Sequence, residues 1–192
     1  GKFMQEAVPS GDGAMLAVLG MSSKELDKIL HENNKKYECF IANDNSEGQV
    51  VISGDLLAVE KAIESSVIGQ LISDVPLGSL LSGGIDSSIV TALMAKNSME
   101  KPKTFTVGFK DSSYDESKYA RAISKHLSTD HTEVLLEEDD CKKVIPHLSK
   151  IYDEPFADSS QIPTYFISKI ARKDVKVVLT GDGADELFGG YN

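Results

Sequence analysis

The chain has 192 residues, of which 41% are hydrophobic, a proportion typical of a globular protein with one substantial core or two small ones. A formal net charge of −10 argues against a nucleic-acid-binding surface, because phosphate backbones attract basic proteins. No apolar run reaches membrane-spanning length and no secretory signal is recognisable, so we expect a cytoplasmic protein with no membrane partner.

The first third of the chain predicts a small α+β arrangement. Ser22 and Glu25 have the spacing of a capping box at a helix start, and Val59, Ile63 and Val67 form the apolar stripe of a second helix. The predicted order is strand, helix, strand, strand and helix, at residues 14–19, 22–35, 37–42, 49–53 and 55–70.

The rest of the chain alternates between strands and helices. We predict strands at 77–81, 103–109, 131–136 and 175–180, and helices at 86–97, 116–127, 139–151 and 160–172. Pro146 should kink the third of these helices. Such alternation favours a parallel α/β sheet that is covered by helices on both faces.

The most informative motif is Ser-Gly-Gly-Ile-Asp-Ser-Ser at residues 82–88, between a predicted strand and a predicted helix. The glycines let the backbone approach a ligand closely, and the N–H groups at a helix start favour an anion. An ordinary glycine turn would explain the two glycines alone. Three serines and an aspartate within the same turn favour a binding site.

Asp86 indicates which kind of anion site this is. The motif lacks the lysine of the common phosphate loop, and a carboxylate repels phosphates unless a hard cation lies between them. We therefore predict a nucleotide site that holds magnesium. Ser87 and Ser88 are interpreted as hydrogen-bond donors and not as nucleophiles, because these motifs contain no histidine to activate them.

A second glycine turn follows the apolar run at 177–179, which we expect to be a buried strand. Asp182, Asp185 and Glu186 place three carboxylates within five residues there. Compensation of a helix dipole would explain acidic residues at this position, at about 0.3–1 kcal/mol each. However, the carboxyl ends of parallel strands share one edge of a sheet, so we expect the two turns, with Asp86 and Asp185, to converge on one ligand.

Five motifs in the same order give residues 63–192 their resemblance to a known family. They are residues 72–78, 82–88, 105–109, 153–160 and 180–191. This segment resembles the synthetase domain of the glutamine-hydrolysing asparagine synthetases. The resemblance implies a doubly wound parallel sheet of the adenine-nucleotide α-hydrolase (PP-loop) type.

The resemblance also implies a reaction. The side-chain carboxylate of aspartate would attack the α-phosphate of ATP, giving β-aspartyl-AMP and pyrophosphate, and ammonia would then displace AMP to form asparagine. ATP, aspartate and ammonia are the implied small-molecule ligands, with Mg²⁺ as the implied metal.

The family's functional positions can be carried onto this chain one by one. Asp182, Asp185 and Tyr191 would act in catalysis, and Asp86 and Asp185 would bind the metal. Asp182 stands where better-known members have glutamate, so its carboxylate is on a side chain shorter by one methylene. The nucleotide would contact the residues Leu80, Ser82, Gly83, Gly84, Asp86, Ser87, Ser88, Val107, Thr180 and Gly181.

Residues 1–63 resemble a different family, through the segments 1–9, 13–15 and 43–54. They are similar to the small ferredoxin-like subdomain of malonyl-CoA:acyl carrier protein transacylase. That enzyme's Gly-x-Ser-x-Gly nucleophile elbow is absent from this sequence. We therefore predict two domains, 1–63 of the transacylase type and 64–192 of the synthetase type.

Several alternatives stay open at this stage. The family continues beyond the point where this chain stops, so we expect an incomplete ATP site with impaired turnover. No glutaminase sequence precedes the synthetase part, so a separate glutaminase or free ammonia would supply nitrogen. The chain could instead be a transacylase fragment that docks acyl carrier protein, or a non-functional hybrid of two gene fragments. The oligomeric state is not predicted.

Overall fold

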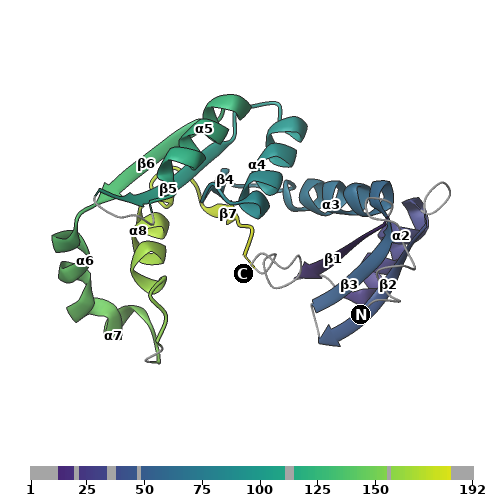
Figure 1. Ribbon diagram of the computed structural model, residues 1–192, viewed down its shortest axis with the longest axis horizontal. Coiled ribbons are helices and arrows are strands. Elements are labelled where there is room, and N and C mark those ends of the chain that lie inside the picture. The colour runs from purple at the N-terminus through teal and green to yellow at the C-terminus, as the bar shows by residue number, and fades with distance from the viewer. Residues whose placement is uncertain are drawn as a thin grey trace. The chain divides into compact units, whose positions relative to one another are not determined.

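The computed structural model describes residues 13–19, 22–33, 38–46, 49–110, 115–154 and 157–182. These residues fall into two compact units. The first comprises the described residues up to Gly69 together with Asp182, the second comprises Gln70–Gly181, and each unit has its own sheet (Figure 1). Among the described helices, none combines the length and the apolar character that a membrane span requires.

The first unit has the predicted order of strand, helix, strand, strand and helix. Its sheet has the order β1-β3-β2, and β3 runs antiparallel to both neighbours. β1 and β2 are therefore parallel strands with β3 between them, which is the split β-α-β arrangement of ferredoxin-like folds. The elements are β1 (Gly13–Leu19), α2 (Ser23–Asn33), β2 (Cys39–Ser46), β3 (Gln49–Asp55) and α3 (Leu56–Gln70).

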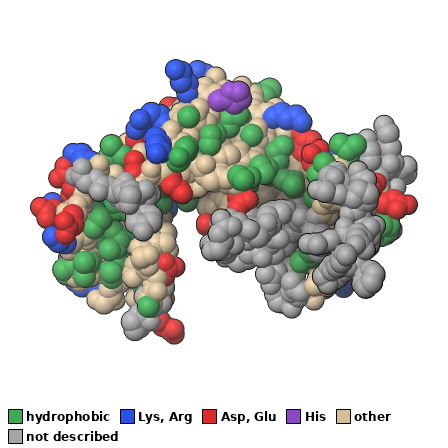
Figure 2. Space-filling model, viewed as in Figure 1, with side chains coloured by type: hydrophobic (Ala, Val, Ile, Leu, Met, Phe, Trp, Pro, Cys, Tyr) green, Lys and Arg blue, Asp and Glu red, His purple; other side chains and the backbone are tan. Residues whose placement is uncertain are grey.

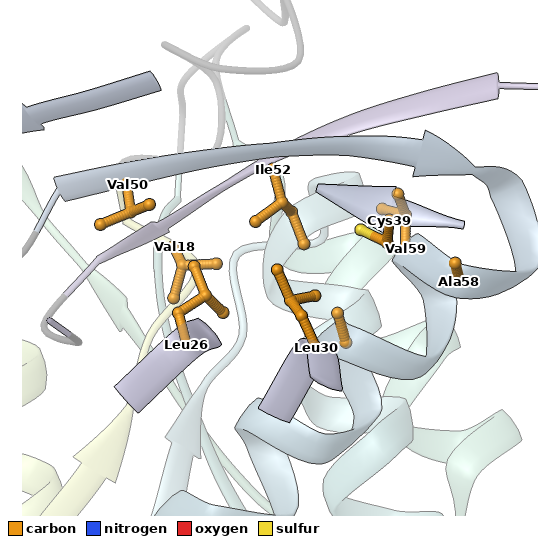
Figure 3. Close-up of a cluster of buried hydrophobic side chains, with 9 residues drawn as sticks. Val18, Leu26, Leu30, Cys39, Val50, Ile52, Ala58 and Val59 are labelled. Atoms are coloured by element: carbon orange, nitrogen blue, oxygen red, sulfur yellow. The ribbon is translucent and has the colours of Figure 1, made fainter. Parts of the chain in front are cut away.

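The predicted capping box at the start of α2 is confirmed. The Ser22 N–H donates to Glu25 Oε2 at 3.0 Å, and the Glu25 N–H donates to Ser22 Oγ at 3.4 Å. The helix so begun packs Leu26 and Leu30 against the sheet (Figure 3). The buried cluster of the first unit comprises Val18, Leu26, Leu30, Cys39, Val50, Ile52, Ala58, Val59 and Ala62.

The second unit is an α/β structure with a parallel sheet of order β6-β5-β4-β7, which confirms the predicted fold class. The expected break at Pro146 is present, because a 3₁₀ turn at Ile145–His147 separates α6 from α7. The other elements are β4 (Leu77–Leu80), α4 (Ile85–Asn97), β5 (Lys103–Phe109), α5 (Ser117–Leu127), β6 (Asp130–Leu136), α6 (Glu138–Val144), α7 (Leu148–Ile151), α8 (Gln161–Ala171) and β7 (Val177–Leu179).

Helices cover both faces of this sheet, as predicted. Ser79 hydrogen-bonds to Thr91 of α4, whereas the next residue, Leu80, packs against the cluster that contains Ala171 of α8. Neighbouring residues of a strand point to opposite faces, so α4 and α8 lie on opposite sides of β4 (Figure 1).

The expectation that 177–179 would be a buried strand is wrong. β7 is the edge strand of the described sheet, and Val177 is 43% exposed. An edge strand has a neighbour on one side only, so an apolar run there need not be enclosed on every side.

Charged side chains are mixed on the surface around α6, where Figure 2 shows acidic and basic groups side by side. Lys142 Nζ lies 2.8 Å from Glu138 Oε1, and Lys143 Nζ lies 3.3 Å from Asp140 Oδ1. Asp140 also closes a capping box with Glu137, which begins the helix. This acidic stretch is therefore a solvated helix start.

Candidate active site at the carboxyl edge of the parallel sheet

The strand order identifies one edge position as the natural place for a ligand. From β4 the chain moves outward to β5 and then β6, but it returns to pair β7 with the other side of β4. The direction of winding thus reverses between β4 and β7. In open α/β sheets, ligands bind outside the carboxyl ends of the strands at such a switch point.

The Ser82–Ser88 loop lies at the carboxyl end of β4, as predicted, and its serines organise its shape. The Gly84 N–H donates to Ser82 Oγ at 3.2 Å, the Ser82 and Ser87 hydroxyl oxygens are 2.9 Å apart, and Ser87 Oγ donates to the Gly84 carbonyl at 3.3 Å. These three bonds form a closed ring. Ser88 Oγ also donates to the Gly84 carbonyl, at 2.5 Å. The serine hydroxyls therefore fix the shape of this turn, and with it the positions of the backbone N–H groups at the start of α4.

Gly83 needs to be glycine for two reasons. Its φ is +94°, a conformation that L side chains rarely adopt. A Cβ at this position would also lie 2.8 Å from the backbone nitrogen of Ala120 and 2.8 Å from Cβ of Tyr119. The loop is thus pressed against the first turns of α5, which limits its freedom.

The turn after β7 contacts the loop after β4. A Cβ on Gly181 would lie 2.6 Å from the backbone nitrogen of Ser87 and 2.9 Å from the carbonyl carbon of Asp86. Only a glycine allows the two backbones to approach this closely. The two glycine turns, about a hundred residues apart in the sequence, therefore meet at the start of α4.

Four of the residues expected to contact the nucleotide lie in, or directly after, three neighbouring strands. Leu80 ends β4, Val107 lies in β5 next to it, and Thr180 and Gly181 follow β7 on the other side. The Leu81 N–H donates to the Phe105 carbonyl at 2.9 Å, which continues the β4–β5 ladder to the loop. The structure therefore brings these positions to the same edge as the loop.

The acidic residues are only partly described. Asp86 lies in the first turn of α4 and is half-buried, and Asp182 is an exposed residue directly after Gly181. Asp185, Glu186 and Tyr191 lie outside the described residues. Within the described ranges, no group of three His, Cys, Asp or Glu side chains could hold a metal ion. Asp86, next to the glycine turn, has the carboxylate chemistry that would suit one ligand of a Mg²⁺ ion.

Sequence reasoning missed the groups that support this site. Asp115 accepts hydrogen bonds from the Phe109 N–H at 3.2 Å, the Ser117 N–H at 3.2 Å and the Ser117 hydroxyl at 3.0 Å. Desolvation acts to raise the pKa of Asp115, but the hydrogen bonds from Ser117 and Phe109 outweigh it and lower that pKa. Asp115 thereby ties the end of β5 to the start of α5. The sequence signal for this contact was an aspartate two residues before a serine at a helix start.

An open hollow of about 570 Å³ lies farther along the same edge, at the ends of β5 and β6. Its walls include Phe109 and Leu136, and its rim carries Glu137, Glu138 and Asp139. Lys110 Nζ is 2.5 Å from Glu137 Oε1. Lys110 offsets one of the three carboxylates, and the net acidic lining does not favour a phosphate in this hollow.

Comparison with known proteins gives a family for the second part of the chain. The family model described as asparagine synthase matches residues 58–192, which is more than half of the chain. The glutamine-hydrolysing asparagine synthetase 1 of Bacillus subtilis is 42% identical over 134 residues, which cover 70% of this chain and 21% of that protein.

Two likenesses to solved structures are too distant to bear on fold or function. An NH3-dependent NAD synthetase of Campylobacter jejuni has 15% identity and a TM-score of 0.46, covering 65% of this chain and 55% of its own. An acyl-carrier-protein S-malonyltransferase of Burkholderia pseudomallei has 21% identity and a TM-score of 0.34, covering 64% and 42%.

The chain spans only 21–26% of the length of the first curated relatives that it matches. Within that span, the match includes both glycine turns and the strands that carry them. The chain belongs to the asparagine synthase family.

Proposed function

We propose that the second unit binds ATP at the switch point between β4 and β7 and uses it to activate the side-chain carboxylate of aspartate for amide formation. The observation that carries this proposal is the contact of Gly181 with the backbone of Ser87, which joins the two glycine turns into one site. Membership of the asparagine synthase family supports the choice of reaction.

The phosphate tail would bind at the N-terminus of α4. The first N–H groups of any helix have no partner within the helix, and they carry the positive end of its dipole. α4 begins at Ile85, immediately after the two glycines, so a phosphate can approach its backbone closely. Because the loop is braced by its own serines, these donors are held in place before the ligand arrives.

In this reaction, a carboxylate oxygen of aspartate forms a bond to the α-phosphorus of ATP. The bond between that phosphorus and the oxygen bridging to the β-phosphate breaks, and pyrophosphate leaves with the electron pair. Ammonia then attacks the activated carbonyl, loses a proton, and displaces AMP. Preorganised N–H donors favour this sequence because they stabilise negative charge that builds on the departing pyrophosphate.

Magnesium would be held by Asp86, with Asp185 as the second protein ligand that the family resemblance suggests. When bound, Mg²⁺ would neutralise part of the charge on the phosphate oxygens. Asp182, Asp185 and Tyr191 remain proposed catalytic residues next to the aspartate substrate.

Calorimetric titration with ATP tests the proposal. With MgCl₂ present, Asp86→Asn should bind ATP at least about tenfold more weakly than the unchanged chain, because the metal loses a charged ligand. With EDTA present, the same variant should bind ATP as well as the unchanged chain or better, because a repulsive charge is gone. This reversal is specific to a carboxylate that acts through a cation.

Asp130→Asn is the matched control. Asp130 is the first residue of β6, so it lies at the amino ends of the strands, opposite the proposed site. Its Oδ2 lies 3.7 Å from Lys103 Nζ. Its removal should leave ATP affinity unchanged under both conditions. Absence of heat with the unchanged chain, or identical titrations for Asp86→Asn, would overturn the ATP proposal. Pyrophosphate release that does not depend on added aspartate would overturn the choice of substrate.

We also propose the division into domains at residues 63 and 64, with the first of them of the transacylase type. The split β-α-β sheet and the separate apolar cluster of the first unit support a domain there. Ala58, Val59 and Ala62 of α3 pack into that cluster, while the family match already begins at residue 58. The join therefore lies within α3. Titration with acyl carrier protein tests whether the first domain binds that protein as a transacylase domain would. Absence of binding would contradict a carrier-protein-docking role for this domain.

A further inference from the structure

Two buried threonines fasten the two ends of the glycine loop. Thr106 Oγ1 donates to the carbonyl of Leu81, the residue directly before the loop, at 2.5 Å. Thr91 Oγ1 donates to the carbonyl of Ser87, four residues earlier in α4 and near the other end of the loop, at 2.7 Å. The two threonines come from different elements, β5 and α4.

Neither side chain can contact a ligand directly. Thr91 is 0% exposed and Thr106 is 3% exposed. A buried hydroxyl is costly unless it is hydrogen-bonded, and valine would fill the same space without that requirement. The hydroxyls at these positions thus serve the backbone that they bind.

Ser79 extends the arrangement into β4. Its hydroxyl lies 2.9 Å from Thr91 Oγ1, and Ser79 is also 0% exposed. Since the Thr91 hydrogen is used by the Ser87 carbonyl, Ser79 is the donor in this pair. The strand, the helix and the loop end are therefore connected through a single oxygen.

We propose that Thr91 and Thr106 are positioning residues that set the separation of the loop ends and thereby the affinity of the loop for a phosphate tail. This inference rests on the proposed function, because it names what holds the same anion site in shape. The N–H groups at the start of α4 can converge on a phosphate only if Leu81 and Ser87 keep their places.

The test compares buried threonine-to-valine changes at three positions. Thr91→Val and Thr106→Val should each weaken binding of Mg·ATP and of inorganic pyrophosphate by roughly two- to tenfold, the range expected for one lost hydrogen bond. Thr91→Ser and Thr106→Ser keep the hydroxyl and should bind within about twofold of the unchanged chain. Ser79→Ala should have a smaller effect than Thr91→Val, because the bond from Thr91 to Ser87 remains.

Thr104→Val is the matched control. Thr104 is 0% exposed and lies in the same strand as Thr106, but its hydroxyl pairs with Thr129 at 2.8 Å and His131 at 2.9 Å, away from the loop. It should lose stability as the other valine variants do, while its affinity for pyrophosphate stays unchanged. A loss of affinity as large as that of Thr106→Val would overturn the proposal.

Amide hydrogen exchange of residues 82–88 in the unliganded chain separates this inference from the proposed function. Exchange should be faster in Thr91→Val and Thr106→Val than in the unchanged chain or in Thr104→Val. If the unchanged chain binds neither ATP nor pyrophosphate, the ATP proposal fails and the exchange rates alone decide the positioning role. Equal exchange in all four proteins would overturn it.

Discussion

The two units of this chain differ in how many polar side chains they bury. The first unit buries an apolar cluster that includes Val50 and Ile52, both 0% exposed, and no polar residue appears among its described buried side chains. The second unit has a smaller cluster around Phe105 and buries seven serines and threonines: Ser79, Ser87, Thr91, Thr104, Thr106, Ser117 and Ser124.

This difference follows from what each sheet must support. An apolar cluster stabilises a fold without directional contacts, whereas a hydroxyl fixes the backbone group to which it bonds. Ser87 belongs to the glycine loop, Thr91 and Thr106 bond to the carbonyls of Ser87 and Leu81, and Ser79 bonds to Thr91. The other three buried hydroxyls, of Thr104, Ser117 and Ser124, bond to groups outside the loop.

Removing the largest buried side chain of the second unit should have the largest effect. Phe105 is 1% exposed, and Phe105→Ala should lower the free energy of unfolding by about 3–5 kcal/mol, since it leaves a cavity in a small cluster. Urea denaturation followed by circular dichroism measures this. Phe40 is 59% exposed, so Phe40→Ala should change stability by less than about 1 kcal/mol. Equal losses would show that the cluster around Phe105 does not hold the unit.

The apolar cluster of the first unit can be tested with a graded pair. Ile52→Ala should cost about 2–5 kcal/mol and Ile52→Val about 0.5–1.5 kcal/mol, because the cost follows the volume removed. Leu57 is 53% exposed, and Leu57→Ala serves as the surface control. If Ile52→Ala also changed hydrogen exchange at residues 82–88, the division of roles between the two units would be wrong.

Gly83→Ala should combine a loss of stability with a loss of anion binding. The new Cβ would meet the backbone of Ala120 in a positive-φ conformation, at a cost of about 1–3 kcal/mol. Gly69→Ala is the opposite case, because Gly69 lies in helix α3 with nothing within 4 Å of the added carbon. That variant should be more stable by about 0.5–1 kcal/mol. Thermal melts and pyrophosphate titration of both variants would separate them, and unchanged binding by Gly83→Ala would contradict the site.

The smallest expected effect is a pH dependence at His131. Within the described ranges its Nε2 is buried without a hydrogen-bond partner, and desolvation lowers the pKa of His131 despite the attraction of Glu133, while Arg121 lowers it further. The unfolded chain therefore binds a proton more readily than the folded chain. This contribution to stability is complete above about pH 6.5 and is lost as the pH falls toward the lower folded pKa.

Urea denaturation at pH 7.5 and pH 5.5 would measure that loss. His131→Gln should reduce the dependence on pH, whereas the exposed His126, changed to Gln, should leave it intact. A larger slope in His131→Gln would contradict the sign of the expected shift.

Much of the fold followed from local patterns. The strand Lys103–Phe109 has its predicted bounds, the Ser22–Glu25 capping box begins α2, and Pro146 interrupts a helix as expected. Each of these features depends on residues within a few positions of one another, so a single sequence contains the information. The position of the glycine loop between β4 and α4 belongs to the same class.

The tertiary structure alone decided how distant parts meet. Strand order is set by packing across the whole unit. Local patterns therefore could not show that β4 pairs with β7, or that Gly181 contacts Ser87 as a result. Thr106 bonds to the Leu81 carbonyl 25 residues earlier, a contact that depends on how the strands pack. Asp115 bonds to the Phe109 N–H, and Thr91 bonds to the Ser87 carbonyl four residues earlier in its own helix; neither bond was predicted from the sequence. The sequence determined which segments could bind a phosphate, and long-range packing determined which groups hold them in place.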